Sequence, residues 1–292
     1  MFFAFDREGL IRKNAFREDK MTTYGFIGTG HLGSMLVRKF VETKAIEAED
    51  IVASNRTPEK AQRLAQTLGI RASTNRVVAE LSDVIFICVR PLEVRDVLAE
   101  LQHLFTPNIL LISVAGDVSL KHLQSVCAAR VARAFPSMAS ERLKGVTLLA
   151  FGHNITSLDR HHMTSLFRAI GDTAEVDENR FEVLAELSSC SPGYIAALMR
   201  EFVLAAERKE IPAELAERLA KQTLLGTALL LEDKSFQGLI SSVATKGGIT
   251  EAGVSVIQAQ APGMFDELFS ATQSRHNLVK KRVDAQGYAK EQ

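Results

Sequence analysis

Cysteine is scarce in the sequence and neither sign of charge is in excess, and each absence excludes a class of protein. The 292 residues include three cysteines, Cys88, Cys127 and Cys190, which lie far apart and show no C-x-x-C spacing. So few thiols exclude a disulfide scaffold and fit a reducing cytoplasm. The 35 basic residues balance the 35 acidic residues, so no overall field attracts nucleic acid or an anionic membrane. A charged ligand therefore needs a local site.

Long apolar runs and metal-ligand spacings are missing too. No run approaches the ~20 residues that span a bilayer, and Phe2 to Phe5 is too short for a signal-peptide core. We therefore expect a cytoplasmic protein without a membrane partner. The neighbouring His161 and His162 diverge around a helix and make a poor chelate, so no metal site is expected.

The first twenty residues are highly charged and are expected to form a poorly ordered extension, 1–20. Met21 stands directly before the first expected strand, so translation from Met1 and translation from Met21 both stay open. No function is assigned to this segment.

From Thr23 onward, short β-rich runs alternate with helical patterns, which is typical of βαβ units and a mostly parallel sheet. Runs that are apolar nearly throughout suit strands covered on both faces. The expected strands are Tyr24 to Gly28, Asp50 to Ser54, Val84 to Val89, Asn108 to Val114, Arg130 to Phe135, Val146 to Phe151 and Thr173 to Val176. The expected helices are Leu32 to Thr43, Pro58 to Leu68, Leu92 to Leu104, Leu120 to Cys127 and Ser157 to Ile170.

Beyond about Arg180 the pattern becomes purely helical. The expected helices are Pro192 to Arg208, Pro212 to Leu231, Phe236 to Val243, Ile249 to Gln258 and Pro262 to Val283, several of which begin at a proline. Their apolar surface exceeds what one small domain hides, so we expect a homodimer or a higher homo-oligomer. The fold class is therefore α/β, with a Rossmann-type, mostly parallel sheet domain over 21–180 followed by an all-α helical dimerisation and substrate domain over 181–292.

A glycine-rich turn follows the first expected strand. Gly28-Thr29-Gly30-His31-Leu32-Gly33 places G-x-G-x-x-G between a strand and a helix. Gly28 permits a tight turn, Gly30 lets the backbone approach a pyrophosphate, and Gly33 permits close packing of the helix on the strand. The helix start adds free N–H groups and a favourable dipole. A bare glycine pattern is weak, but the strand before it and the helix after it strengthen the prediction of a dinucleotide site.

The end of the second expected strand selects between the two nicotinamide cofactors. An acidic residue there usually holds the ribose 2′-hydroxyl of NAD, whereas a 2′-phosphate favours cations and hydroxyls. Here the residues are Ser54, Asn55 and Arg56, with no carboxylate. Arg56 offers a permanently charged planar fork for phosphate, so the expected cofactor is NADP, as NADPH. The alternative is that Arg56 is a solvated loop residue.

Two further segments leave the sheet at its carboxyl edge, where open α/β sheets bind ligands. The segment C-V-R-P at 88–91 follows one strand, and S-V-A-G at 113–116 follows the next. We expect the nicotinamide end of the cofactor to contact Val89, Arg90, Pro91 and Ala115. An equally open interpretation is that the proline and the glycine only end these strands and bind nothing.

Three further segments stand on the expected helical half: S-C-S-P-G-Y at 189–194, Q-T-L-L-G-T-A at 222–228 and V-A-T-K-G-G-I-T at 243–250. On these motifs and on C-V-R-P at 88–91, the chain resembles pyrroline-5-carboxylate reductase, from about Met21 to the last helices. In that order, the four segments are similar to the family's G-S-G-P-A-Y, Q-T-x-x-G-A-A, V-T-S-P-G-G-T-T and C-V-K-P.

The resemblance implies NADPH-dependent reduction of a cyclic imino acid, pyrroline-5-carboxylate to proline or a close analogue, and so a role in proline biosynthesis. It implies that the loop with Lys246, Gly247 and Gly248 holds the substrate carboxylate. Thr250 would lie beside the imine as the catalytic residue, and Cys190 would replace a serine at the substrate end. The residues agree independently, because exposed glycine N–H groups before a helix attract a carboxylate. The active site would lie between cofactor and helical half, within one chain or completed by a neighbouring subunit.

Several departures from the family pattern bear on the substrate. P-N-T-P becomes P-S-M-A at 136–139, Lys246 stands where proline is usual, and Ile249 stands where threonine is usual. The charge of Lys246 suggests a related imino acid of altered size or with an additional acidic group. A Lys246 that faces solvent is the competing interpretation.

Two other functions stay open. A hydroxyacid dehydrogenase-like oxidoreductase of similar layout would need a lysine on the first long helix, and Pro192 to Arg208 contains none. A catalytically lapsed NADP-binding relative with a regulatory or assembly role is kept open by the altered motifs. Imine-dependent oxidation of NADPH distinguishes the reductase from the lapsed relative.

Overall fold

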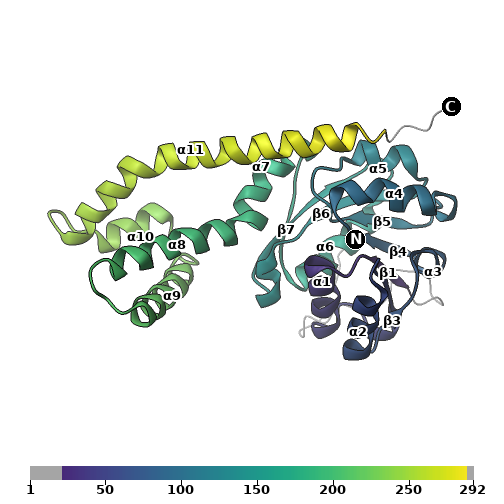
Figure 1. Ribbon diagram of the computed structural model, residues 1–292, viewed down its shortest axis with the longest axis horizontal. Coiled ribbons are helices and arrows are strands. Elements are labelled where there is room, and N and C mark those ends of the chain that lie inside the picture. The colour runs from purple at the N-terminus through teal and green to yellow at the C-terminus, as the bar shows by residue number, and fades with distance from the viewer. Residues whose placement is uncertain (1–21, 288–292) are drawn as a thin grey trace, which may run out of the picture.

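The computed structural model describes residues 22–287, which form a sheet-containing half and an elongated helical half (Figure 1). The expected extension 1–20 lies outside the described residues. The strands are β1 (Tyr24–Ile27), β2 (Ile51–Ser54), β3 (Arg71–Ala72), β4 (Val84–Ile87), β5 (Leu110–Ser113), β6 (Arg130–Phe135), β7 (Gly145–Phe151) and β8 (Gly171–Glu175). The helices are α1 (His31–Glu42), α2 (Pro58–Leu68), α3 (Asn75–Leu81), α4 (Pro91–Leu101), α5 (Leu120–Val126), α6 (Ser157–Arg168), α7 (Phe181–Ala185), α8 (Ser191–Glu207), α9 (Ala213–Leu230), α10 (Phe236–Val243) and α11 (Ile249–Asp284).

The eight strands form one sheet in the order β3-β2-β1-β4-β5-β6-β7-β8. Neighbouring strands are parallel except for β6 and β7, which are antiparallel. The strand order reverses at β1, which pairs with β2 on one side and with β4 on the other. In open α/β sheets, ligands bind at the carboxyl edge beside such a switch point. The expected fold class is confirmed.

Helices cover both faces of the sheet and form two apolar cores. One core contains side chains from α3, α4, α5, α7 and the end of α11, and the other contains side chains from α1, α2 and α6. In the second core, Phe26 of β1 stacks on Phe86 of β4 with ring centroids 4.5 Å apart, and Phe40 of α1 packs beside both. These aromatic contacts hold β1, β4 and α1 together, so the loops that leave β1 and β4 have a rigid base.

A buried ion pair ties β6 to α6. The Nε atom of Arg130 lies 2.9 Å from Oδ2 of Asp159, and its Nη2 atom lies 3.1 Å from Oδ1. The same carboxylate accepts the backbone N–H of Thr156 at 2.9 Å, and the Asp159 side chain is 3% exposed. Burial raises the pKa of Asp159, but the bonds from Arg130 and Thr156 outweigh it and hold that pKa below its usual value.

The helical half extends away from the sheet, and α11 returns along it (Figure 1). Near its end, α11 buries Val283 in the core of the sheet domain, and the side-chain amide of Gln286 donates to the carbonyl oxygen of Leu92 at 2.9 Å. Many large apolar side chains on α8 to α11 are exposed, among them Phe202, Phe236, Val256 and Ile257. The division of the chain near residue 180 stays a prediction, although the pattern of elements changes there from mixed to helical.

Two expectations about single elements were wrong or incomplete. The two helices expected at Ile249 to Gln258 and Pro262 to Val283 are one helix, α11, with Pro262 inside it. A proline removes one hydrogen bond of the ladder, and because Pro262 is exposed, water can bind the freed carbonyl oxygen. The short elements β3, α3 and α7 were not expected from the sequence, since helices of five and seven residues show too little periodicity.

Candidate active site

In the glycine turn between β1 and α1, two glycines pack too closely for a side chain and a third has open space beside it. Gly28 has a φ of 102°, and a Cβ atom there would lie 2.7 Å from the carbonyl oxygen of Cys88. At Gly33 a Cβ atom would lie 2.1 Å from the carbonyl oxygen of Gly28. At Gly30 a Cβ atom would meet nothing within 4 Å. The turn thus leaves backbone exposed in front of the α1 N-terminus, as a pyrophosphate requires.

Thr29 connects this turn to the turn after β2. Its N–H donates to Oδ1 of Asn55 at 3.0 Å, and the Asn55 amide donates to the carbonyl oxygen of Thr57 at 3.1 Å. The Thr29 hydroxyl is buried and has no hydrogen-bond partner among residues 22–287. Buried hydroxyls are usually bonded, so a group that binds in this turn would satisfy it. His31 is exposed and Leu32 is partly buried beside the turn.

Arg56 lies at the end of β2 and its guanidinium is exposed. Its Nη1 atom lies 2.7 Å from Oε1 of Glu93, and Arg90 approaches the same oxygen at 2.6 Å. The Arg56 side chain is 79% exposed, so it can turn toward a bound ligand. The hydroxyl of Ser54, in contrast, is buried and donates to Oδ1 of Asn75 at 2.7 Å. Of Ser54, Asn55 and Arg56, Arg56 is therefore the residue whose side chain can turn toward a 2′-phosphate.

The loops after β4 and β5 reach the same edge as the glycine turn. The N–H of Cys88 donates to the carbonyl oxygen of Ile27 at 2.8 Å, so the chain stays beside β1 after β4 ends. Val89 and Pro91 are partly buried, Arg90 is exposed and Ala115 is buried. The structure thus places the expected cofactor residues on four loops at the carboxyl edge of β1, β2, β4 and β5.

A π-helical turn at Glu186–Cys190 joins α7 to α8 and contacts the end of β6. The hydroxyl of Ser189 donates to the carbonyl oxygen of Phe135 at 3.2 Å, and the Ser137 hydroxyl donates to that of Ser188 at 3.3 Å. Cys190 therefore lies near the carboxyl edge. Burial and the charge of Glu186 raise the pKa of its thiol, which makes Cys190 a poor nucleophile and fits the replacement of a serine.

The loop with the two glycines lies at the other end of the molecule. It connects α10 to α11 at the tip of the helical half, far along the ribbon from β1 and β4 (Figure 1). Gly247 has a φ of 73°, and its N–H donates to Oε2 of Glu251 at 2.6 Å. Lys246 and Thr250 are exposed. Within one chain the structure does not bring this loop to the candidate cofactor residues.

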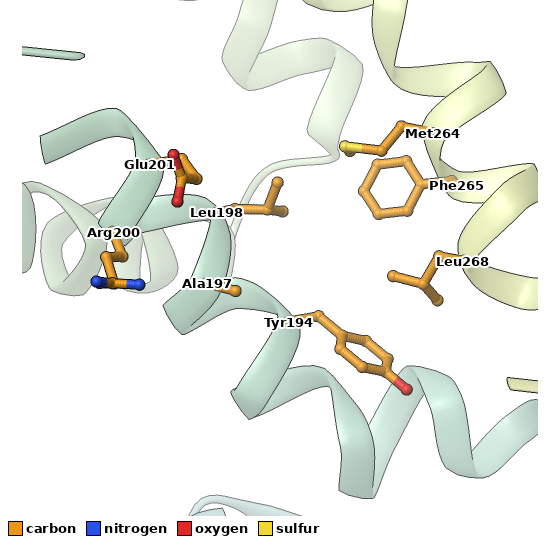
Figure 2. Close-up of a pocket in the computed structure, with 8 residues that line it drawn as sticks. All are labelled: Tyr194, Ala197, Leu198, Arg200, Glu201, Met264, Phe265 and Leu268. Atoms are coloured by element: carbon orange, nitrogen blue, oxygen red, sulfur yellow. The ribbon is translucent and has the colours of Figure 1, made fainter. Parts of the chain in front are cut away.

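An apolar groove lies between α8 and α11. Figure 2 shows the Tyr194 ring and Leu198 on one side of a cavity of about 300 Å³, with Met264, Phe265 and Leu268 on the other. Leu198 and Phe265 remain 41% and 39% exposed, which is unusual for side chains of this size in a finished core. The groove is shaped to receive further apolar side chains.

Three residues at the π-helical turn form a cluster that the sequence did not predict. Asp117, Glu186 and His276 lie on three different elements and meet through hydrogen bonds of the imidazole ring. They are separated by 69 and 90 positions in the sequence, so no local motif could have connected them.

Two family models match the two halves of the chain. Residues 23–116 match "NADP oxidoreductase coenzyme F420-dependent", and residues 178–278 match "Pyrroline-5-carboxylate reductase dimerisation". Pyrroline-5-carboxylate reductase 3 of Bacillus subtilis is 30% identical over 273 residues, which cover 91% of this chain and 100% of that protein. The chain belongs to the pyrroline-5-carboxylate reductase family. ComE operon protein 4 of the same organism is 29% identical over 268 residues, covering 88% of this chain and 98% of that protein.

Solved structures of pyrroline-5-carboxylate reductases have the same fold. The enzyme from Coxiella burnetii is 27% identical and superposes with a TM-score of 0.78 over 93% of this chain and 100% of that chain. The Plasmodium falciparum structure with NADP bound is 20% identical, with a TM-score of 0.77 over 89% of this chain and 97% of that chain, and shows the fold alone.

Membership of the pyrroline-5-carboxylate reductase family confirms the resemblance seen in the sequence. The expected class, an NADP-using oxidoreductase that acts on C=N bonds, is confirmed at the level of the family. The dimerisation model covers the groove between α8 and α11 and most of the exposed apolar helices. Among residues 22–287, no helix is both long enough and apolar enough to cross a membrane.

Proposed function

We propose that this protein uses NADPH to reduce a cyclic imino acid, pyrroline-5-carboxylate or a close analogue. The crowded glycine turn carries the proposal, because Gly28 and Gly33 exclude side chains while Gly30 leaves backbone open to a pyrophosphate. The unpartnered, buried hydroxyl of Thr29 offers a further hydrogen bond in the same turn. The match of residues 23–116 to an NADP oxidoreductase model supports this cofactor.

NADP fits the residues at the carboxyl edge. Gly28, Gly30, Gly33 and the start of α1 would bind the pyrophosphate, and Arg56 beside Asn55 would bind the 2′-phosphate. The loops at 88–91 and 113–116 would position the nicotinamide end through Val89, Arg90, Pro91 and Ala115. The cofactor supplies the hydride for the carbon of the C=N bond.

The loop between α10 and α11 of a second copy would bind the substrate. The N–H of Gly247 already holds a carboxylate, that of Glu251, which supports binding of a substrate carboxylate in the same place, whereas the N–H of Gly248 donates to the carbonyl oxygen of Thr245. The Thr250 hydroxyl would hydrogen-bond the imine nitrogen, and Lys246 would pair with an acidic group of the substrate. Cys190 would border the substrate from the first copy. We therefore propose a homodimer with each site shared between two subunits, assembled through the exposed apolar helices.

Oxidation of NADPH at 340 nm with pyrroline-5-carboxylate and with piperideine carboxylates tests the activity. Two inactive variants test the shared site: Gly33→Val blocks the dinucleotide turn, and Thr250→Val removes the proposed hydroxyl. Co-expressed with different tags, they should recover about one quarter of wild-type activity, because half the dimers are mixed and each mixed dimer has one intact site of two. A site formed within one chain would give no recovery, and an active Thr250→Val enzyme would exclude the role of that hydroxyl.

A catalytically lapsed relative is the second candidate, and the bond from Gly247 to Glu251 favours it. A carboxylate of the chain itself occupies part of the proposed anion site, so a substrate has to displace it. Tight NADPH binding without turnover of any tested imino acid, in the wild type and in Glu251→Gln, would support this candidate and contradict the reductase.

A further inference from the structure

His276 of α11 lies between two carboxylates from different parts of the chain. Its Nδ1 atom is 2.7 Å from Oδ1 of Asp117, and its Nε2 atom is 3.1 Å from Oε1 of Glu186. The side chains of His276, Asp117 and Glu186 are 19%, 9% and 3% exposed, so water screens these contacts weakly. The Tyr194 hydroxyl donates to the other oxygen of Glu186.

Both carboxylates belong to segments at the carboxyl edge of the sheet. Asp117 directly follows Ala115 and Gly116 in the loop that leaves β5, and its backbone has a φ of 60°, which is unfavourable for most residues. Glu186 begins the π-helical turn that is bonded to the end of β6, and such turns occur often at functional sites. One imidazole ring thus connects the nicotinamide-end loop, the π-helical turn and α11.

With both carboxylates ionised, the arrangement requires a protonated ring. A neutral imidazole has one N–H group and can donate to only one of the two carboxylates, whereas an imidazolium donates to both. Burial lowers the pKa of His276, but the hydrogen bonds and charges of Asp117 and Glu186 outweigh it and raise that pKa above its ordinary value.

The other charged groups around the ring do not replace it. Lys280, one turn along α11, is bonded to Glu182 of α7 at 3.1 Å. Cys190 and Tyr194 face Glu186 from the π-helical turn and α8, and burial raises the pKa of both groups, so both stay neutral and add no charge. His276 is therefore the cation that lies between these two carboxylates.

We propose that His276 is a positioning residue for the reductase: its protonated ring holds the loop after β5 and the π-helical turn in place around the nicotinamide end of the cofactor. The role in turnover rests on the proposed function, whereas the effect on the nicotinamide half of the cofactor does not. As the pH rises through the raised pKa, the ring loses a proton, one of the two bonds is lost, and the loop is released.

His276→Gln removes the charge and keeps one hydrogen bond. Binding of NADPH should weaken at least tenfold, while binding of adenosine 2′,5′-bisphosphate, which lacks the nicotinamide end, should not change. The alkaline limb of the kcat profile should disappear. His122→Gln is the matched control, because His122 of α5 also pairs with a carboxylate of α11, that of Asp284 at 3.0 Å, eight residues beyond His276. It should change neither affinity nor the pH profile.

Asp117→Asn and Glu186→Gln provide independent variants, and asparagine tolerates the backbone at 117. Each removes one negative charge beside His276 and should shift the alkaline limb to lower pH. The proposal would be overturned if His276→Gln weakened the binding of NADPH and of the bisphosphate equally, or left both affinities unchanged. If His276→Gln does not fold, the same comparison in the two carboxylate variants decides. Absence of imine turnover in the wild type would refute the proposed function alone, since the ratio of the two affinities still decides the role of His276.

Discussion

Selection of NADPH over NADH should depend on Arg56, and the structure sets the size of the effect. The Arg56 guanidinium is paired with Glu93, with Nη1 2.7 Å from Oε1. The two side chains are 79% and 30% exposed, so the pair is worth about 0–1 kcal/mol. A 2′-phosphate therefore has little to displace.

The gain from the phosphate is larger than this cost. Hydrogen bonds to charged groups contribute about 1.5–3 kcal/mol, which leaves about 2 kcal/mol net for Arg56 on the 2′-phosphate. Since every 1.4 kcal/mol is tenfold in affinity, Arg56→Ala should weaken NADPH binding about 10- to 100-fold. NADH binding should change less than about twofold, because its ribose hydroxyl carries no charge. Glu93→Gln should strengthen NADPH binding by up to about fivefold, since Arg56 no longer has to leave a partner.

Fluorescence titration of both cofactors measures these affinities without any substrate. Arg76→Ala is the control, because Arg76 is an exposed arginine of the same domain with its own partner, Glu80 at 2.8 Å. An equal loss for NADPH and NADH in Arg56→Ala would refute the assignment of the 2′-phosphate to this residue. A loss of NADPH affinity in Glu93→Gln would also refute it, because the ion pair of Arg56 with Glu93 would then be needed for cofactor binding.

Three further variants test the turn, the core and the assembly. Gly33→Ala places a Cβ atom 2.1 Å from the carbonyl oxygen of Gly28, so NADPH affinity should fall at least about tenfold, and a wild-type titration would contradict the packing. Asp159→Asn should destabilise the fold by about 2–3 kcal/mol in urea at pH 7. Because the folded pKa of Asp159 is lowered, its contribution is present above the ordinary carboxyl pKa and is lost as the pH falls toward the lowered one, so the variant should be less sensitive to acid over that window. Phe202→Glu, on a side chain 68% exposed, should dissociate the oligomer in sedimentation experiments, whereas Leu81→Glu on α3 should not.

The sequence predicted the parts of the fold that depend on local patterns. Apolar runs gave every strand except β3, and helix boundaries shifted by a few residues at most because helix ends carry weak signals. Pro262 predicted a break between two helices, because a proline often ends a helix. Here it is exposed inside one helix, where the loss of one hydrogen bond is tolerated. The candidate cofactor residues are close in the sequence or follow adjacent strands, so their grouping was predictable. The contacts of His276 were not, because they depend on where α11 crosses the sheet domain.

The position of the loop between α10 and α11 explains why the substrate site could not be placed from the sequence of one chain. Motifs for cofactor and substrate occur on the same chain, which suggests a cleft between its two halves, yet the helical half carries the glycine loop away from β1 and β4 (Figure 1). The same helices expose Phe202, Val256 and Ile257, at 68%, 64% and 65%. Contact of so much apolar surface with water is unfavourable and is typical of an interaction surface. In the proposed homodimer, a two-fold pairing through these helices would bury that surface and would bring each loop toward the sheet of the other copy. Burial of apolar surface and completion of the site would then be one event. Activity per subunit should therefore fall when the protein is diluted below its dimer dissociation constant, while NADPH binding to each subunit persists.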